Sequence, residues 1–176
     1  MRNANNDLRL TTYDLQPIRV LAVDPGYDRV GIAVAEKKSA GKDELLYSAC
    51  FTTNRSESFY KRLAAIGAEI LSAIDTYAPT TLAIEELFFN TNQTTAMRVA
   101  EVRGMIIYLA GVHNVPVVEF TPSQVKQAVT GYGKSSKKDM EKMLPLLTTI
   151  EKRHRLDDEY DAIAIALTCL ATRTLP

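Results

Sequence analysis

Short apolar runs alternate with longer segments of helical periodicity along this chain. Runs rich in β-branched residues predict strands, and apolar residues three and four apart predict helices. The expected strands cover about residues 18–24, 30–37, 44–52, 80–85 and 115–120. The expected helices cover about residues 56–77, 92–113, a short stretch after 121–124, a basic stretch broken near Pro145, and a closing stretch from residue 157.

The order of these elements predicts the fold class. Turn-rich GYDR and KKSAGKD join the first three strands, which is typical of an antiparallel meander. The later strands alternate with helices, as parallel strands do. The chain is therefore expected to form one α/β domain over residues 18–176, with a mixed five-stranded sheet and helices on both faces. The polar segment 1–17 precedes it as an N-terminal extension with no assigned role.

Helix caps can also be predicted from side-chain type. Ser56 is the expected N-cap of the helix over 56–77, which should stop before Pro79. The TPSQ sequence at 121–124 predicts a capping box at the start of the short helix.

Four acidic residues occur where predicted strands end or where the closing helix begins. Asp24 in LAVDPG and Glu85 in LAIEELFF each end a run typical of a strand buried on both faces. Asp158 and Asp161 are three apart, so they project from one helical face. Carboxylates that converge at one sheet edge repel each other unless a divalent cation neutralises them, and oxygen ligands favour Mg²⁺ or Mn²⁺. Two such ions, about 4 Å apart, are the usual clamp for in-line phosphodiester cleavage.

Each of these acids also has a purely structural interpretation. Asp24 could cap an Asp-Pro-Gly turn, Glu85 could begin a solvated loop, and Asp158 could be the helix N-cap. Asp161 differs, because it lies inside the helix beside apolar AIAIAL, where an unpaired charge is costly. Asp157 shares a helical face with Asp161 too, so the third ligand is either Asp157 or Asp158.

The distribution of charge indicates a polyanionic partner, although the net charge does not. The chain has 21 basic and 21 acidic residues, a net charge of zero. Residues 126–155, however, hold eight basic and three acidic residues, a local charge of +5. Such a segment beside a carboxylate cluster suits a substrate whose phosphate backbone is steered toward bound metal. Taken one at a time, the lysines are more typical of a solvated helix face, so only the local excess of charge is informative.

Composition places the chain in a reducing compartment. Cys50 and Cys169 lack metal-site spacing and lie in apolar runs, which favours free thiols over a disulfide. No apolar run is long enough to span a bilayer, and the first 17 residues lack the apolar core of a signal peptide. The protein is expected to be cytoplasmic, without a membrane partner.

The helix over 92–113 carries a stripe of small residues. Ala96, Ala100 and Gly104 fall four apart, so another backbone can approach closely on that side. The stripe could pack on the protein's own sheet or pair two subunits about a dyad.

Four blocks of the sequence, in this order, resemble the RuvC family of Holliday-junction resolvases, which have an RNase H-like fold. The resemblance covers roughly residues 18 to 172, and the blocks are LAVDPGYDRVGIAV, LAIEELFF, TPSQVKQAVTGYGKSSKKDM and DDEYDAIAIAL. It implies a homodimer, paired through the helix over 92–113, that resolves four-way DNA junctions by symmetric Mg²⁺-dependent nicks in recombination and repair. Branch-migration helicase machinery is an expected partner.

The resemblance also implies roles for particular residues. It makes metal-binding and catalytic carboxylates of Asp24, Glu85, Asp158 and Asp161, holding two Mg²⁺ ions that Mn²⁺ could replace. It places Phe88 against the unstacked bases of the junction. It places Lys126 and Lys137 near the scissile phosphate, and the basic segment also includes Lys134 and Lys138 as expected DNA contacts.

Two other functions are compatible with parts of the sequence. A YqgF-like nuclease acting on RNA shares the opening strand and hairpin, but the basic VKQ segment and the FF after Glu85 favour the resolvase. A junction-binding module without catalysis is the second alternative, and the presence of all four carboxylates argues against it.

Overall fold

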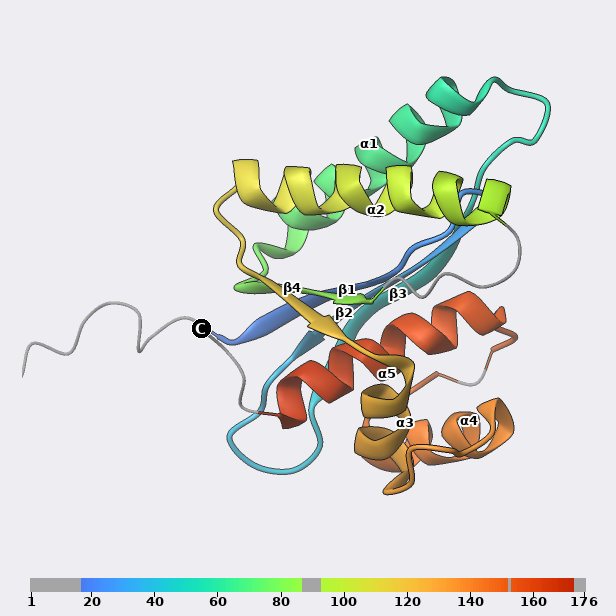
Figure 1. Ribbon diagram of the computed structural model, residues 1–176. Coiled ribbons are helices and arrows are strands. Elements are labelled where there is room, and N and C mark those ends of the chain that lie inside the picture. Colours follow the sequence, from blue (N-terminus) through green and yellow to red (C-terminus); the bar gives the residue numbers. More distant parts are fainter. Residues whose placement is uncertain (1–16, 87–92, 152, 173–176) are drawn as a thin grey trace, which may run out of the picture.

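Five strands form one mixed sheet between two layers of helices in the computed structural model, which describes residues 17–86, 93–151 and 153–172 (Figure 1). In chain order the elements are β1 (Arg19–Asp24), β2 (Arg29–Glu36), β3 (Glu44–Thr52), α1 (Phe59–Tyr77), β4 (Thr81–Glu85), α2 (Gln93–Val112), β5 (Val117–Phe120), α3 (Pro122–Thr130), α4 (Lys137–Leu147) and α5 (Asp157–Ala171). The strand order across the sheet is β3-β2-β1-β4-β5.

Strand direction agrees with the predicted topology. β1, β2 and β3 form an antiparallel meander, and β4 and β5 add to the edge of β1 as parallel strands. Helices α1 and α2 cover one face of the sheet, and α3, α4 and α5 cover the other (Figure 1). The predicted mixed α/β sheet with helices on both faces is confirmed.

The central strand is buried on both sides. In β1, Val20 and Ala22 pack into the apolar cluster under α5, whereas Leu21 and Val23 pack into the cluster under α1 and α2. All four side chains are fully buried. This period-two division explains why the run is apolar throughout, and it leaves Asp24, at the end of the strand, as its first acidic residue.

The predicted start of the first helix was wrong. α1 begins at Phe59, and its N-cap is Ser58, whose side chain makes no capping hydrogen bond. Ser56 instead forms a local turn, because its backbone N–H and its hydroxyl both donate to Asn54 Oδ1, at 3.0 and 2.8 Å. Side-chain type alone did not distinguish two serines in the same loop.

The predicted break near Pro145 was also wrong. Pro145 lies inside α4, which continues to Leu147. Pro145 lies in the last turn of the helix, so its missing amide donor removes one hydrogen bond near the end of the ladder. The TPSQ capping box is confirmed, since the Thr121 side chain accepts from the Gln124 amide and Gln124 Oε1 accepts from the Thr121 amide.

Both cysteines are free thiols, Cys169 buried and Cys50 partly buried. Among the helices of the described residues, none is both long and apolar enough to cross a membrane.

Candidate active site

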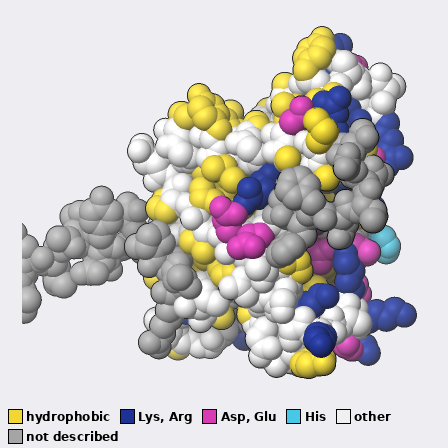
Figure 2. Space-filling model, viewed as in Figure 1, with side chains coloured by type: hydrophobic (Ala, Val, Ile, Leu, Met, Phe, Trp, Pro, Cys, Tyr) yellow, Lys and Arg dark blue, Asp and Glu magenta, His cyan; other side chains and the backbone are white. Residues whose placement is uncertain are grey.

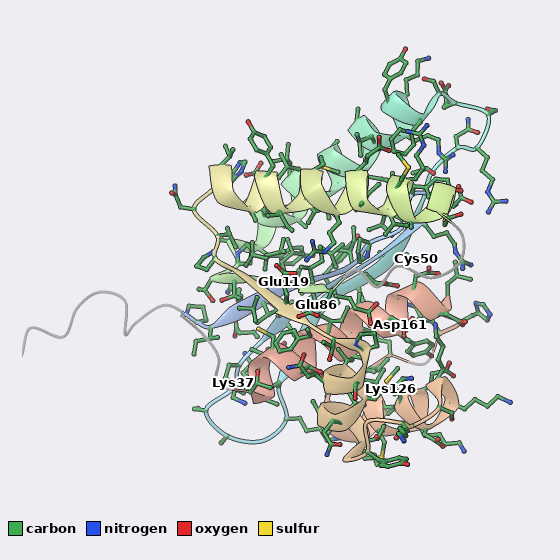
Figure 3. All side chains as sticks on the ribbon, in the orientation of Figure 1. Lys37, Cys50, Glu86, Glu119, Lys126 and Asp161 are labelled. Atoms are coloured by element: carbon green, nitrogen blue, oxygen red, sulfur yellow. The ribbon has the colours of Figure 1, made fainter. Side chains whose placement is uncertain are left out.

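The four predicted carboxylates line one pocket at the edge of the sheet. Asp24 ends β1, Glu85 ends β4, and Asp158 and Asp161 come from the first turns of α5. The pocket has a volume of about 380 Å³, and its other lining residues are Pro122, Val125, Lys126, Lys137, Met140 and Ile165. Figure 3 shows Asp161 of α5 and Lys126 of α3 on the same side of the sheet.

A glycine in β2 brings the first turn of α5 onto the sheet. Gly31 pairs with Asp24 across the β1–β2 ladder. A Cβ atom at Gly31 would lie 1.8 Å from the carbonyl oxygen of Asp158, so only glycine allows this approach. Asp158 therefore lies beside the end of β1 although the two acids are far apart in sequence.

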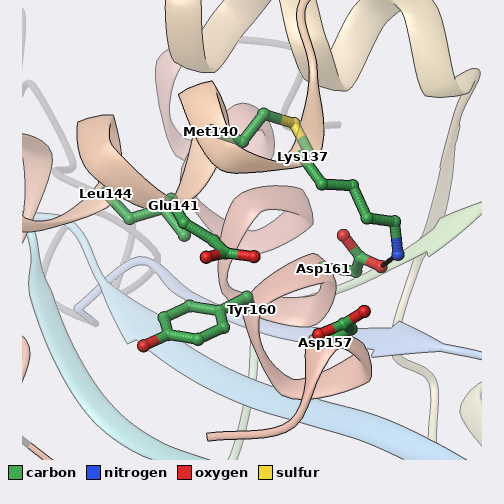
Figure 4. Close-up of a pocket in the computed structure, with 7 residues that line it drawn as sticks. All are labelled: Lys137, Met140, Glu141, Leu144, Asp157, Tyr160 and Asp161. Atoms are coloured by element: carbon green, nitrogen blue, oxygen red, sulfur yellow. Dashed lines mark hydrogen bonds and ion pairs between the residues drawn. The ribbon is translucent and has the colours of Figure 1, made fainter.

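The structure separates Asp158 from Asp157. Asp158 lines the pocket with the other three carboxylates, whereas Asp157 lines a small neighbouring pocket beside Glu141 and Tyr160. Figure 4 shows Asp157 on α5 below Asp161, with Lys137 of α4 reaching toward Asp161. The N-cap of α5 is Leu156, so the interpretation of Asp158 as an N-cap is wrong.

Burial and repulsion from neighbouring carboxylates make Asp24 and Glu85 hard to ionise. The pKa of Asp24 is raised to about 8, first by burial and then by the charges of Asp161, Glu85 and Asp158, while Lys137 opposes the shift. The pKa of Glu85 is also raised, by burial and then by Asp161. The pocket thus gathers four carboxylates and two lysines, and an additional cation would favour the ionised form of the carboxylates.

Two of the carboxylates have cationic partners from the protein. Lys137 Nζ lies 2.7 Å from Asp161 Oδ2 (Figure 4), and Arg29 Nε lies 3.0 Å from Asp158 Oδ2. Within the described residues, no three His, Cys, Asp or Glu side chains surround one point closely enough to hold a metal ion as they stand. The oxygen-only donor set fits Mg²⁺, which would compete with Arg29 and Lys137 for the carboxylates.

The predicted DNA contacts fall in three places. Lys126 and Lys137 line the pocket, whereas Lys134 and Lys138 are exposed and do not line it. Phe88 lies outside the described residues.

The sequence reasoning missed Arg29 and Gly31. Arg29 follows a turn and shows no local sign that it pairs with Asp158. Gly31 did carry a signal, because an isolated glycine in a strand indicates close approach of another backbone.

Comparison with known proteins identifies the family. The family model described as crossover junction endodeoxyribonuclease RuvC matches residues 20–169. The chain belongs to this family. A relative from Thermosipho melanesiensis, named crossover junction endodeoxyribonuclease RuvC, is 43% identical over 157 residues, which cover 89% of this chain and 99% of the relative.

Solved structures agree with this membership. Thermus thermophilus RuvC in complex with Holliday junction substrate has a TM-score of 0.80 and 32% identity, covering 86% of this chain and 92% of that one. The yeast mitochondrial Holliday junction resolvase Ydc2, at 18% identity and a TM-score of 0.68, shares the fold and covers 87% of this chain and 78% of its own. The predicted RNase H-like sheet is confirmed, and RuvC membership disfavours the YqgF-like alternative.

Proposed function

We propose that this RuvC-family protein resolves four-way DNA junctions by Mg²⁺-dependent hydrolysis of phosphodiester bonds. The supporting observation is that four carboxylates and two lysines from five separate elements line one pocket. A pocket of this kind suits a phosphate backbone, because the lysines attract it and the carboxylates can hold cations beside it.

Asp24, Glu85, Asp158 and Asp161 are the residues that would hold two Mg²⁺ ions, with Mn²⁺ as a substitute. When bound, such ions supply a deprotonated water at neutral pH and stabilise the leaving 3′ oxygen. The water oxygen forms a bond to phosphorus, the P–O3′ bond breaks, and a 5′-phosphate and a 3′-hydroxyl result. No side chain of the protein need act as nucleophile.

Lysines in and near the pocket position the backbone. Lys126 and Lys137 approach it from α3 and α4, and the exposed Lys134 and Lys138 extend the same basic segment. Phe88 stays a prediction, in which its ring stacks on an unpaired base at the crossover. A branch-migration helicase as partner and a cytoplasmic location stay predictions as well.

Symmetric cleavage requires two active sites, and the exposed face of α2 supports a homodimer. Met97 and Tyr108 are 65% and 67% exposed, and Gly104 faces open space. Apolar side chains around a glycine suit close pairing of two helices. Gly104→Leu should convert a dimer into a monomer in light scattering, whereas Ala64→Leu on the exposed side of α1 should not. A monomeric unmodified protein would contradict the dimer.

The decisive experiment compares a mobile four-way junction with linear duplex of the same sequence, in Mg²⁺ and in EDTA. We expect paired, ligatable nicks on the junction in Mg²⁺ alone. Asp161→Asn and Glu85→Gln should reduce nicking by about a thousandfold or more and preserve binding, since metal contacts contribute several kcal/mol to the transition state.

Other outcomes would redirect the proposal. Near-normal nicking by either variant would refute the metal assignment, and binding without cleavage by the unmodified protein would support the non-catalytic alternative. If the protein cleaves RNA in preference to the DNA junction, the result would support the YqgF-like alternative. An inactive Asp157→Asn together with an active Asp158→Asn would shift the third ligand by one residue.

A further inference from the structure

Arg103 connects α2 to the ends of two strands at the edge of the pocket. Its Nε donates to the carbonyl oxygen of Glu85 at 3.2 Å, and its Nη2 forms an ion pair with Glu119 of β5. The Arg103 side chain is 17% exposed and that of Glu119 is 47% exposed, so the ion pair lies at the surface, whereas the contact with the Glu85 carbonyl is partly buried. Figure 2 shows basic and acidic side chains adjoining at the surface between α2 and β5. Figure 3 shows Glu119 in β5 and Glu86 directly after β4.

Glu85 lies at the end of β4, where the pairing with β1 has ended and the pairing with β5 continues. The ladder between β1 and β4 ends at the pair Val23 and Ile84, so on that side Glu85 extends one residue beyond it. On the other side it pairs with Phe120 of β5. Its side chain shares the pocket with three other carboxylates, whose like charges push it away.

Helix α2, which carries Arg103, packs tightly on the core. Val102, Ile106 and Ala110 are fully buried against the sheet, which fixes the helix next to Arg103. A guanidinium has donors in a planar fork, so one side chain can reach a carbonyl and a carboxylate at the same time. A lysine ammonium on a flexible stem lacks that fixed geometry.

We propose that Arg103 is a positioning residue for Glu85, which fixes the end of β4 so that the Glu85 carboxylate stays directed into the pocket. The inference rests on the proposed function, because it assigns Arg103 a part in the metal-dependent reaction. The competing interpretation is an ordinary surface ion pair between Arg103 and Glu119, which would contribute little to stability and nothing to catalysis.

The test uses full-length Arg103→Ala and Arg103→Lys, with Glu119→Gln and a matched control. The control is Arg98→Ala on the same helix, since Arg98 pairs with Glu101 at 2.9 Å and stacks on the Phe59 ring, away from the pocket lining. The measurements are single-turnover cleavage of a four-way junction, the half-saturating Mg²⁺ concentration, junction Kd in Ca²⁺, Tm, and Mn²⁺ binding without DNA.

We expect Arg103→Ala to lower the cleavage rate and the metal affinity by about 10–100-fold, the usual effect of losing an outer-shell contact. Junction Kd and Tm should stay close to the unmodified values. Arg103→Lys should recover only part of the rate. Glu119→Gln should have a small effect, because the contact between Arg103 and the Glu85 carbonyl remains, and Arg98→Ala should have none.

Unchanged cleavage and Mn²⁺ binding in Arg103→Ala would overturn the inference. So would a rate loss equal to that of Arg98→Ala, full recovery by Arg103→Lys, or a rate loss that only follows a lowered Tm. If the unmodified protein fails to cut the junction, the proposed function is wrong. The Mn²⁺ affinities of the variants then still test whether Arg103 positions Glu85.

Discussion

Neighbouring acids on α5 lie in opposite electrostatic surroundings. Glu159 is 2% exposed, and its carboxylate accepts from Ser48 Oγ at 2.6 Å and from Arg155 Nε at 3.0 Å. Asp158 and Asp161, on either side of it in sequence, line a pocket with two further carboxylates. Glu159 is buried among hydrogen-bond donors, whereas Asp158 and Asp161 each have one cationic partner and share a pocket with other carboxylates.

The surroundings of Glu159 form a complete network. Arg153 also pairs with Glu159 and donates to the Ser48 carbonyl at 3.0 Å. Arg155 Nη1 donates to the Glu151 carbonyl at 2.6 Å. Within the described residues, no buried side-chain nitrogen or oxygen lacks a hydrogen-bond partner. The buried charge of Glu159 is thus paired within the protein, whereas in the pocket Arg29 and Lys137 pair with Asp158 and Asp161. Asp24 and Glu85 still feel the repulsion of the other carboxylates.

Removing a partner of the buried Glu159 carboxylate should have the largest effect on stability. Arg155→Ala leaves Glu159 buried with fewer partners, and removing one member of a buried pair costs about 3–5 kcal/mol. Urea unfolding measures this loss. Arg55→Ala is the control, since Arg55 pairs with Asp28 at a 76% exposed side chain and should cost less than about 1 kcal/mol. Equal losses in both variants would show that burial does not distinguish the two pairs.

Binding of a cation in the pocket should have the next largest effect on stability. Mn²⁺ at about 100 times its Kd should add about 2.7 kcal/mol to the free energy of unfolding, because it binds only the folded cluster. Asp161→Asn should lose most of this gain. A thermal shift series with Mn²⁺ and with EDTA checks it, and equal stabilisation of both proteins would place the metal elsewhere.

Removing a repelled charge should stabilise the protein without metal. The pKa of Asp24 in the folded state, about 8, lies above its ordinary value, so ionisation costs stability as pH rises from about 4 to 8. In EDTA, Asp24→Asn should therefore have a higher Tm than the unmodified protein at pH 8 and an equal Tm at pH 4. Each kcal/mol recovered raises Tm by about 2–4 °C in a chain of this size.

Activity sharpens this prediction. Asp24→Asn should lose junction cleavage while it gains stability, as expected where charge is kept for function. If Asp24→Asn is less stable at pH 8 and fully active, Asp24 has a structural role, as Glu159 does, and not a catalytic one.

The basic residues should show the smallest effect. Lys126→Ala and Lys137→Ala should each reduce the slope of log K against log salt by about one, because each removes one phosphate contact. Lys42→Ala is the control, since Lys42 donates to the Pro145 carbonyl and does not line the pocket. Binding titrations over a salt series measure the slope, and identical slopes for all three would remove these lysines from the DNA contact.

Local pattern determined much of this protein. The apolar runs and the turns between them predicted all five strands and their directions. Burial on both faces and short turns both depend on the types of residues that are adjacent in sequence. The acids that end β1 and β4 were also evident, because a charge after such a run has no place in the core. Where several residues of one type lay close together, as with Ser56 and Ser58, local pattern could not choose between them.

The tertiary structure decided which side chains meet. It placed Asp158 and not Asp157 in the pocket with the other carboxylates, where the Asp158 backbone packs closely on Gly31. It also paired Arg29 with Asp158 and brought Arg103 to the Glu85 carbonyl. These contacts join separate elements whose relative positions follow from packing of the whole core, and periodicity within one segment carries no information about them.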